Sequence, residues 1–272
     1  MPQINVKEEV ICFKGDVIKI GQKAGTVYLF LVDGMIIDTG PQCIESEIIL
    51  FYKEHSFDLV TLTHSHEDHS GTAAWIQENH EVPIFVHEKG VHLCAEPCNY
   101  PKYRQKTWGI RREFRASPLA NKIQSRTEEW EVIYTPGHAE DHVALFNKKT
   151  GRMFSGDLFV SPRTKVIMAS ESTPVTMESI RTLLDYDFGP MYCCHSGYHE
   201  NGKALLRQKL DYLENITGEV KHLYHQGRSV AEINDKLFPT KYPIIEVSSG
   251  EWDSVHIITS VLAEEGIDVK QL

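Results

Sequence analysis

One short stretch of the chain constrains its fold and its chemistry more than any other feature. Residues 63–71 read Thr-His-Ser-His-Glu-Asp-His-Ser-Gly and directly follow a strand-like run at 58–62. Three imidazoles and two carboxylates within six residues would repel or desolvate one another in an ordinary turn. Zinc and neighbouring first-row metals accept these groups as ligands. We therefore interpret the stretch as part of a metal site and expect more ligands elsewhere in the chain.

Length and composition restrict the class of protein. The 272 residues carry a net charge of −10, and 41% of them are hydrophobic, which is ordinary for a globular enzyme. No apolar run reaches the roughly 18 residues of a membrane span, and the N-terminus does not resemble a secretory signal. The six cysteines lack a disulfide-framework spacing, so we expect reduced thiols and a cytoplasmic protein without a membrane partner.

The hydrophobic pattern alternates between strands and helices. The first 40 residues are rich in β-branched and aromatic runs, with Asp33-Gly34 as a hairpin turn. The helical pattern resumes after Gly202, where Ser229-Val-Ala-Glu232 is a capping-box sequence. The pattern predicts strands at 58–62, 84–86, 131–134, 143–146, 152–154 and 191–194, and helices at 43–55, 71–79, 88–95, 177–186, 203–215, 218–226, 229–238 and 250–265.

Three more ligand-type side chains follow predicted strands. His138 ends the sequence Thr-Pro-Gly-His after strand 131–134, Asp157 follows Ser-Gly after the strand near 152, and His195 follows strand 191–194. Open sheets present functional loops at the carboxyl ends of their strands. We therefore predict that these side chains meet the 63–71 stretch.

These motifs, in this order, resemble those of the metallo-β-lactamase superfamily, in particular its glyoxalase II-like hydrolase branch. The resemblance spans about residues 25–200 and includes Asp38-Thr39-Gly40. It implies an α/β fold, the four-layer αβ/βα sandwich of that superfamily. It places a catalytic domain at 1–200, with a basic insert at about 97–126, and a helical extension at 201–272 packed on it.

The resemblance also implies a ligand set for two divalent metal ions, with zinc expected and manganese or iron as alternatives. His64, His66 and His138 would bind the first ion. Asp68, His69 and His195 would bind the second, and Asp157 would bridge the two. Asp38 and His142 would contact and orient metal ligands without binding a metal themselves. Ser65 and Glu67 would be spacers facing away from the metals, with Glu67 either solvated or supporting a ligand.

A pair of metal ions with this ligand set implies a hydrolase. A bridging hydroxide would attack a thioester, ester, lactone or phosphodiester bond, and the metals would stabilise the developing charge. Asp68 and His195 would take part in catalysis as ligands. His199, together with Tyr198, is a candidate for protonating the leaving group.

A basic stretch is the second unusual feature of the chain. Residues 102–126 contain eight basic residues and one acidic residue, a charge of +7 within a chain of −10. This stretch is either a solvated surface insert or an active-site lid that attracts an anionic small molecule. The candidate substrate contacts are Lys102, Arg104, Arg111, Arg112, Arg115 and Tyr198.

Other functions stay open at this point. A metal-dependent ribonuclease is a close alternative, although the acidic remainder of the chain does not favour RNA as a partner. An iron-dependent oxidoreductase or sulfur dioxygenase of the same fold is a second alternative, and a non-catalytic, metal-stabilised binding module is a third. The oligomeric state is undetermined, and a homodimer through the helical tail is one option.

Overall fold

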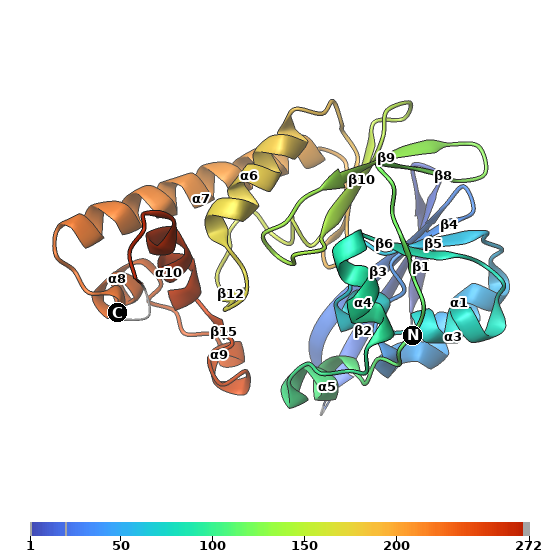
Figure 1. Cartoon of the computed structure of the whole chain (residues 1–272), viewed down its shortest axis with the longest axis horizontal. Coiled ribbons are helices and arrows are strands. Elements are labelled where there is room, and N and C mark those ends of the chain that lie inside the picture. The colour runs from blue at the N-terminus through green and yellow to red at the C-terminus, as the bar shows by residue number, and fades with distance from the viewer. Residues whose placement is uncertain (1, 20, 269–272) are drawn as a thin grey trace. The chain divides into compact units, whose positions relative to one another are not determined.

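The computed structural model describes residues 2–19 and 21–268 (Figure 1). Residue 20, within the strand-rich first 40 residues, and the outer limits of both predicted domains lie outside the described residues. Backbone contacts divide the described chain into two compact units. The first unit comprises the described residues within 1–134, 140–160 and 187–202, and the second those within 135–139, 161–186 and 203–272.

A seven-stranded sheet forms one half of the first unit. Strands β1 to β4 pair as antiparallel neighbours, and β4 to β7 pair as parallel neighbours. The predicted hairpin turn is present, with positive φ angles at Asp33 (45°) and Gly34 (76°). The strands are β1 (Gln3–Lys7), β2 (Val10–Lys19), β3 (Gln22–Val32), β4 (Met35–Ile37), β5 (Leu59–Thr61), β6 (Ile84–Val86) and β7 (Ser117–Pro118).

A six-stranded sheet forms the other half, in the order β14-β13-β11-β10-β9-β8. Only the β11–β13 pair is parallel among these described strands. The strands are β8 (Lys122–Gln124), β9 (Glu129–Tyr134), β10 (Val143–Asn147), β11 (Arg152–Gly156), β13 (Met191–Cys193) and β14 (Gly197–His199).

The two sheets pack face to face over an aromatic core. Phe30 of the first sheet contacts Phe154 and Tyr192 of the second, with ring centroids 5.4 and 5.5 Å apart. Helices cover the outer face of the first sheet, where Phe51 and Ile76 join its core. These helices are the 3-10 helix η1 (Gln42–Ile44), α1 (Glu45–Glu54), α2 (Glu67–Ser70), α3 (Ala73–Asn79), α4 (Glu88–Ala95) and α5 (Lys102–Trp108).

The second unit is mainly helical and has a core of its own. Ile257, Ile258, Val261 and Leu262, the apolar residues of the helical tail, are buried in this core. Its elements are β12 (Ile167–Met168), α6 (Thr173–Leu184), α7 (Gly202–His225), α8 (Val230–Leu237), α9 (Pro243–Val247), β15 (Trp252–Asp253) and α10 (Val255–Glu264). The division differs from the predicted boundary at residue 200, because residues 161–186 group with the C-terminal helices.

Two details of the second unit bear on the predictions. The capping box at Ser229 and Glu232 is present at the start of α8. The prediction of separate helices at 203–215 and 218–226 is wrong, because α7 runs unbroken through Gly218. Within the described part of the chain, no helix combines the length and apolarity needed to cross a membrane.

Candidate metal centre

The ligand-rich stretch forms a closed turn between β5 and α3. The four residues of α2, Glu67–Ser70, are all buried. Thr39 N–H donates to the His69 carbonyl oxygen at 2.6 Å, and Ser70 Oγ donates to the Ser65 and His66 carbonyl oxygens. A Cβ at Gly71 would lie 2.5 Å from Gln42 N and 2.6 Å from the Glu67 carbonyl oxygen, so only glycine fits there. The backbone of the turn is therefore fixed by its neighbours.

Asp38 lies beneath this turn and contacts His69, one of its predicted ligands. Its Oδ1 accepts from Thr63 N–H at 2.7 Å, and its Oδ2 accepts from His69 Nδ1–H at 2.9 Å and from the Cys194 thiol at 2.8 Å. The backbone of Asp38 adopts a left-handed conformation, with φ of 57°. Because His69 Nδ1–H donates its hydrogen bond to Asp38, the Nε2 atom of that ring is left to act as a ligand.

His69 and His195 approach the same two carboxylates. His195 Nε2 lies 3.3 Å from Asp68 Oδ2 and 3.1 Å from Asp157 Oδ2, and His69 Nε2 lies 3.4 Å from Asp157 Oδ2. His69 Nε2 is buried without a hydrogen-bond partner among the described residues. Ligand atoms about 2.0–2.2 Å from a tetrahedral metal are roughly 3.4 Å from one another. These distances fit a metal site as well as they fit hydrogen bonds.

Grouping of the ligand atoms supports the same interpretation. One ligand atom from each of Asp68, His69 and His195 lies within 4.8 Å of the others, and the same holds for His64, His69 and Asp157. His195 Nδ1 donates to the Thr26 carbonyl oxygen at 2.9 Å, which again leaves Nε2 for a metal. The donor set of imidazole nitrogens and carboxylate oxygens fits zinc, manganese or iron.

His64 and His66 lie next to this group. His64 Nε2 and His66 Nδ1 are 3.0 Å apart, and His64 is fully buried. Thr63 Oγ1 lies 3.1 Å from His64 Nδ1, so the hydroxyl orients that ring. The two imidazoles are therefore close enough to share one ion, and that they do so stays a prediction.

His138 lies on the connection between β9 and β10, within residues 135–139 of the second unit. Its Nδ1 lies 3.1 Å from Glu171 Oε2, and Glu171 Oε1 accepts from Met168 N–H at 2.8 Å. A carboxylate hydrogen-bonded to one ring nitrogen leaves the other for a metal. The sharing of an ion between His138, His64 and His66 stays a prediction.

His142 supports Asp157 rather than binding a metal itself. Its Nε2 accepts a hydrogen bond from Asp157 N–H at 3.0 Å. A Cβ at Gly156, which has a φ of 49°, would lie 2.4 Å from the same His142 Nε2. The backbone at Asp157 is therefore held against the His142 ring, and the role of His142 in supporting a metal ligand stays a prediction.

Opposite charges dominate the electrostatics of this cluster. Burial alone would raise the pKa of Asp68, but His69 and His195 outweigh it and hold that pKa well below its usual value. Burial alone would lower the pKa of His195, but Asp157 and Asp68 hold it well above its usual value. Without a metal, the raised pKa values favour protonated rings at His69 and His195, and a bound cation would replace those protons.

Comparison with known proteins agrees with this geometry. The sequence profile of the metallo-β-lactamase superfamily matches residues 24–195, more than half of the chain. The chain belongs to this superfamily. The Bacillus subtilis (strain 168) protein named "Probable metallo-hydrolase YqjP" is 24% identical over 264 residues, which cover 80% of this chain and 82% of that relative.

Solved structures of the superfamily share the fold. A metallo-β-lactamase family protein from Thermus thermophilus superposes with a TM-score of 0.72 at 18% identity, covering 95% of this chain and 94% of that one. A β-lactamase domain protein from Burkholderia ambifaria superposes with a TM-score of 0.68 at 17% identity, covering 98% and 85%. The predicted fold class and superfamily are confirmed, and the chain is a metallo-hydrolase of this superfamily.

The candidate leaving-group acids lie on β14. His199 Nε2 is 2.8 Å from Ser196 Oγ, and burial lowers the pKa of His199. The Tyr198 ring packs on Tyr192, with centroids 5.4 Å apart, and Lys7 Nζ lies 5.6 Å from the Tyr198 centroid. Their roles in proton transfer and substrate binding stay predictions.

Several cations of the basic stretch already have protein partners. Arg104 pairs with Glu67 and Arg112 with Glu78. The Arg111 guanidinium is buried and donates to the Cys94 and Leu93 carbonyl oxygens at 2.9 and 2.8 Å, which gives it a structural role. The remaining two candidate substrate contacts, Lys102 and Arg115, are exposed.

Four supporting residues had no signal in the local sequence. Asp141 Oδ2 accepts from Ser65 N–H at 2.8 Å within the ligand turn. The Trp108 ring lies 6.2 Å from the His195 ring. Glu171 and Arg104 are the other two. Each lies 30 or more residues along the chain from the group that it contacts, so only the tertiary fold brings the two together.

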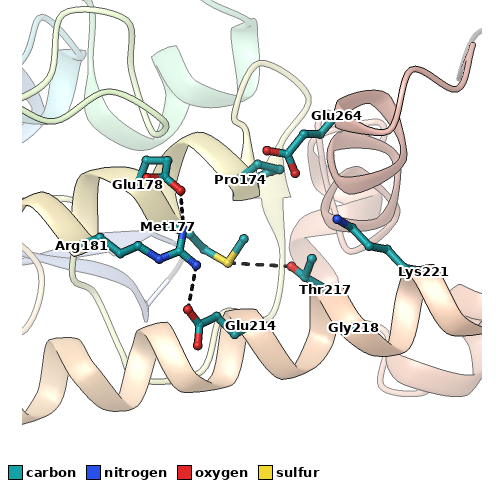
Figure 2. A pocket seen from close by; sticks show the side chains of 9 residues that line it. All are labelled: Pro174, Met177, Glu178, Arg181, Glu214, Thr217, Gly218, Lys221 and Glu264. Atoms are coloured by element: carbon teal, nitrogen blue, oxygen red, sulfur yellow. Dashed lines mark hydrogen bonds and ion pairs between the residues drawn. The ribbon is translucent and has the colours of Figure 1, made fainter.

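A pocket of about 370 Å³ lies between α6 and α7 in the second unit (Figure 2). Arg181 pairs there with Glu178 and, at 2.7 Å, with Glu214, and Lys221 pairs with Glu265 at 2.6 Å. Its lining residues are Pro174, Met177, Glu178, Arg181, Glu214, Thr217, Gly218, Lys221 and Glu264. Its cations are occupied by carboxylates, and it includes none of the predicted site residues.

Proposed function

We propose that the chain is a binuclear metal-dependent hydrolase that cleaves an ester-type bond of a small anionic molecule. The observation that carries the proposal is the position of Asp157, whose Oδ2 lies 3.4 Å from His69 Nε2 and 3.1 Å from His195 Nε2. His69 and His195 are both assigned to the second ion, and a ligand atom of Asp157 also lies within 4.8 Å of one from His64, which is assigned to the first. This position next to both ligand sets supports Asp157 as the bridging ligand. His64, His66 and His138 would hold the first ion, and Asp68, His69 and His195 the second.

Divalent ions at these positions would lower the pKa of bound water toward neutrality and polarise the bond to be cleaved. The protein's part is to hold the ligands in place. Asp38 fixes the tautomer of His69, Glu171 orients His138, and His142 holds the backbone of Asp157. His199 is the candidate proton donor to the leaving group. Burial lowers its pKa, so its protonated form is favoured only below its usual titration range.

The charge of the substrate and the cellular location are proposed from fewer observations. Lys102 and Arg115 are exposed cations of the basic stretch, and they support an anionic substrate of low molecular weight. All six cysteines are free, which supports a cytoplasmic location.

Elemental analysis of the purified full chain, joined to a substrate panel, tests this function. We expect about two zinc or manganese ions per chain, and hydrolysis of at least one thioester, ester, lactone or phosphodiester in the panel. Asp157→Ala should lose metal and turnover together, whereas Asp187→Ala, a carboxylate outside the cluster, should retain both. One iron per chain with oxygen consumption would instead favour a dioxygenase, and salt-dependent binding of single-stranded RNA would favour a ribonuclease.

A further inference from the structure

Arg104 of the basic stretch reaches the ligand turn. Its Nε donates to Glu67 Oε1 at 2.6 Å, and its Nη2 donates to Glu67 Oε2 at 2.8 Å. Only 12% of the Arg104 side chain and 2% of the Glu67 side chain are exposed. One planar guanidinium thus engages both carboxylate oxygens, a geometry that a lysine ammonium cannot reproduce.

Glu67 occupies a sensitive place in the turn. It is the first residue of α2, and the predicted ligands Asp68 and His69 follow it directly. A buried carboxylate that loses its partner is an uncompensated charge, and it moves toward water. Because α2 has only four residues, a movement of Glu67 would carry Asp68 with it.

The helix that carries Arg104 is itself fixed. The Tyr100 hydroxyl donates to the Gly109 carbonyl oxygen at 2.7 Å and accepts from Arg111 N–H at 2.8 Å, which links the two ends of α5. Gly109 has a φ of 96°, and a Cβ there would lie 2.8 Å from Cys43 N. Because α5 is anchored in this way, the position of Arg104 is fixed by its own helix, and its hydrogen bonds can restrain Glu67.

We propose that Arg104 is a positioning residue of the metal centre. Through its two hydrogen bonds to Glu67, it holds α2 so that the ligand atoms of Asp68 and His69 converge. The basic stretch therefore contributes to metal binding as well as to surface charge. This inference rests on the proposed binuclear site.

The test measures zinc affinity by competition with a chromophoric chelator, together with the unfolding midpoint of each chelated protein. Arg104→Gln should weaken zinc binding by about 10–100-fold, the effect usual for groups that orient metal ligands. Arg104→Lys keeps the charge but loses the paired hydrogen bonds to both Glu67 oxygens. Its zinc affinity should lie between those of the wild type and Arg104→Gln. Arg112→Gln is the matched control, because it removes an exposed arginine–glutamate pair from the same stretch. Its zinc affinity should stay within about twofold of the wild-type value.

A double-mutant cycle separates positioning from general stability. If Arg104 and Glu67 act as a unit, the double variant Glu67→Gln/Arg104→Gln should bind zinc about as weakly as Arg104→Gln alone. The reason is that the single and the double variant remove the same interaction. Wild-type zinc affinity in a folded Arg104→Gln, or a lower unfolding midpoint without a change in affinity, would overturn the inference. If Arg104→Gln does not fold, Arg104→Lys and the double variant decide by the same criteria. If the wild-type chain binds no zinc, manganese or iron, that result would contradict the proposed function and this inference together.

Discussion

Asp38 connects three parts of the metal centre through one carboxylate. It accepts hydrogen bonds from Thr63, His69 and Cys194, which lie on different segments of the chain. An amide in its place would keep the size and the tolerance for positive φ, but would turn one acceptor into a donor that faces other donors. The residue therefore matters through its charge and its acceptor atoms, not through its shape.

Asp38→Asn should bind zinc about 10–100-fold more weakly than wild type, because the Nδ1 proton of His69 loses its acceptor. Competition with a chromophoric chelator measures the affinity. Asp33→Asn is a matched control, since Asp33 also has a positive φ and instead accepts from Ser125 and Thr127. Asp33→Asn should lower stability without changing zinc affinity, and equal zinc affinity in both variants would contradict the role of Asp38.

Metal binding should release protons near neutral pH. The pKa of His69 is held well above its usual value: burial alone would lower it, but Asp157, Asp38 and Asp68 outweigh burial. The pKa of His195 is raised in the same way. Both rings are therefore protonated in the metal-free protein between their unfolded pKa of about 6.5 and their higher folded pKa.

Titration calorimetry of zinc binding in two buffers of different ionisation enthalpy measures this release. We expect about two protons per chain just above pH 7, and fewer once the pH exceeds the raised pKa values. The same shifts predict that the free energy of unfolding of the metal-free protein falls as pH rises through those values, because the protonated rings then lose their ion pairs. Zinc binding without proton release would contradict this account.

At single residues, the sequence pointed to candidate ligands but not to the groups that contact them. His64, His66, Asp68 and His69 lie within six residues, so their spacing alone indicated a site. Glu67 was expected to be either solvated or supporting, and burial at 3% exposure excludes the first alternative. Its partner Arg104 is 37 residues away, and no local pattern links the two. Pairs of this kind depend on tertiary packing, which the sequence does not display.

Among the elements, the strands and helices next to the ligands followed their local pattern closely, while long elements were divided too often. The predicted break between 215 and 218 lies next to Gly218, and glycine disfavours a helix by about 1 kcal/mol relative to alanine. The helix nevertheless continues, because the neighbouring Ile216 and Val220 are buried in the core of the second unit. Tertiary burial outweighs a propensity of that size.

The capping box of α8 gives a prediction for an element. Ser229 Oγ accepts from Glu232 N–H at 3.3 Å, and the Glu232 carboxylate accepts from Ser229 N–H at 2.9 Å. Ser229→Ala should lower the free energy of unfolding by about 1 kcal/mol, measured by urea denaturation. Arg228→Gln, which removes only the exposed pair with Glu232, should change it by less than about 0.5 kcal/mol. Equal effects of the two variants would contradict the importance of the cap.

For the whole molecule, metal and stability should be linked. A ligand that binds the native state alone at 100 times its dissociation constant stabilises it by about 2.7 kcal/mol. Differential scanning calorimetry of the zinc-loaded and chelated protein should therefore show a higher melting temperature with zinc. Superimposable thermograms would mean that zinc does not bind the folded chain. In an Asp157→Ala variant the difference between the two thermograms should be much smaller.

The pairing of β12 with β15 determines where this chain can be cut. Met168 pairs with Trp252, and the Met168 N–H is also bound by Glu171, the residue that contacts His138. A protein ended at residue 200 would contain every predicted ligand, yet β12 would lose the strand beside it. The shortest active fragment should therefore extend past residue 253, so that a two-residue strand with no part in the chemistry sets the minimum length of the enzyme.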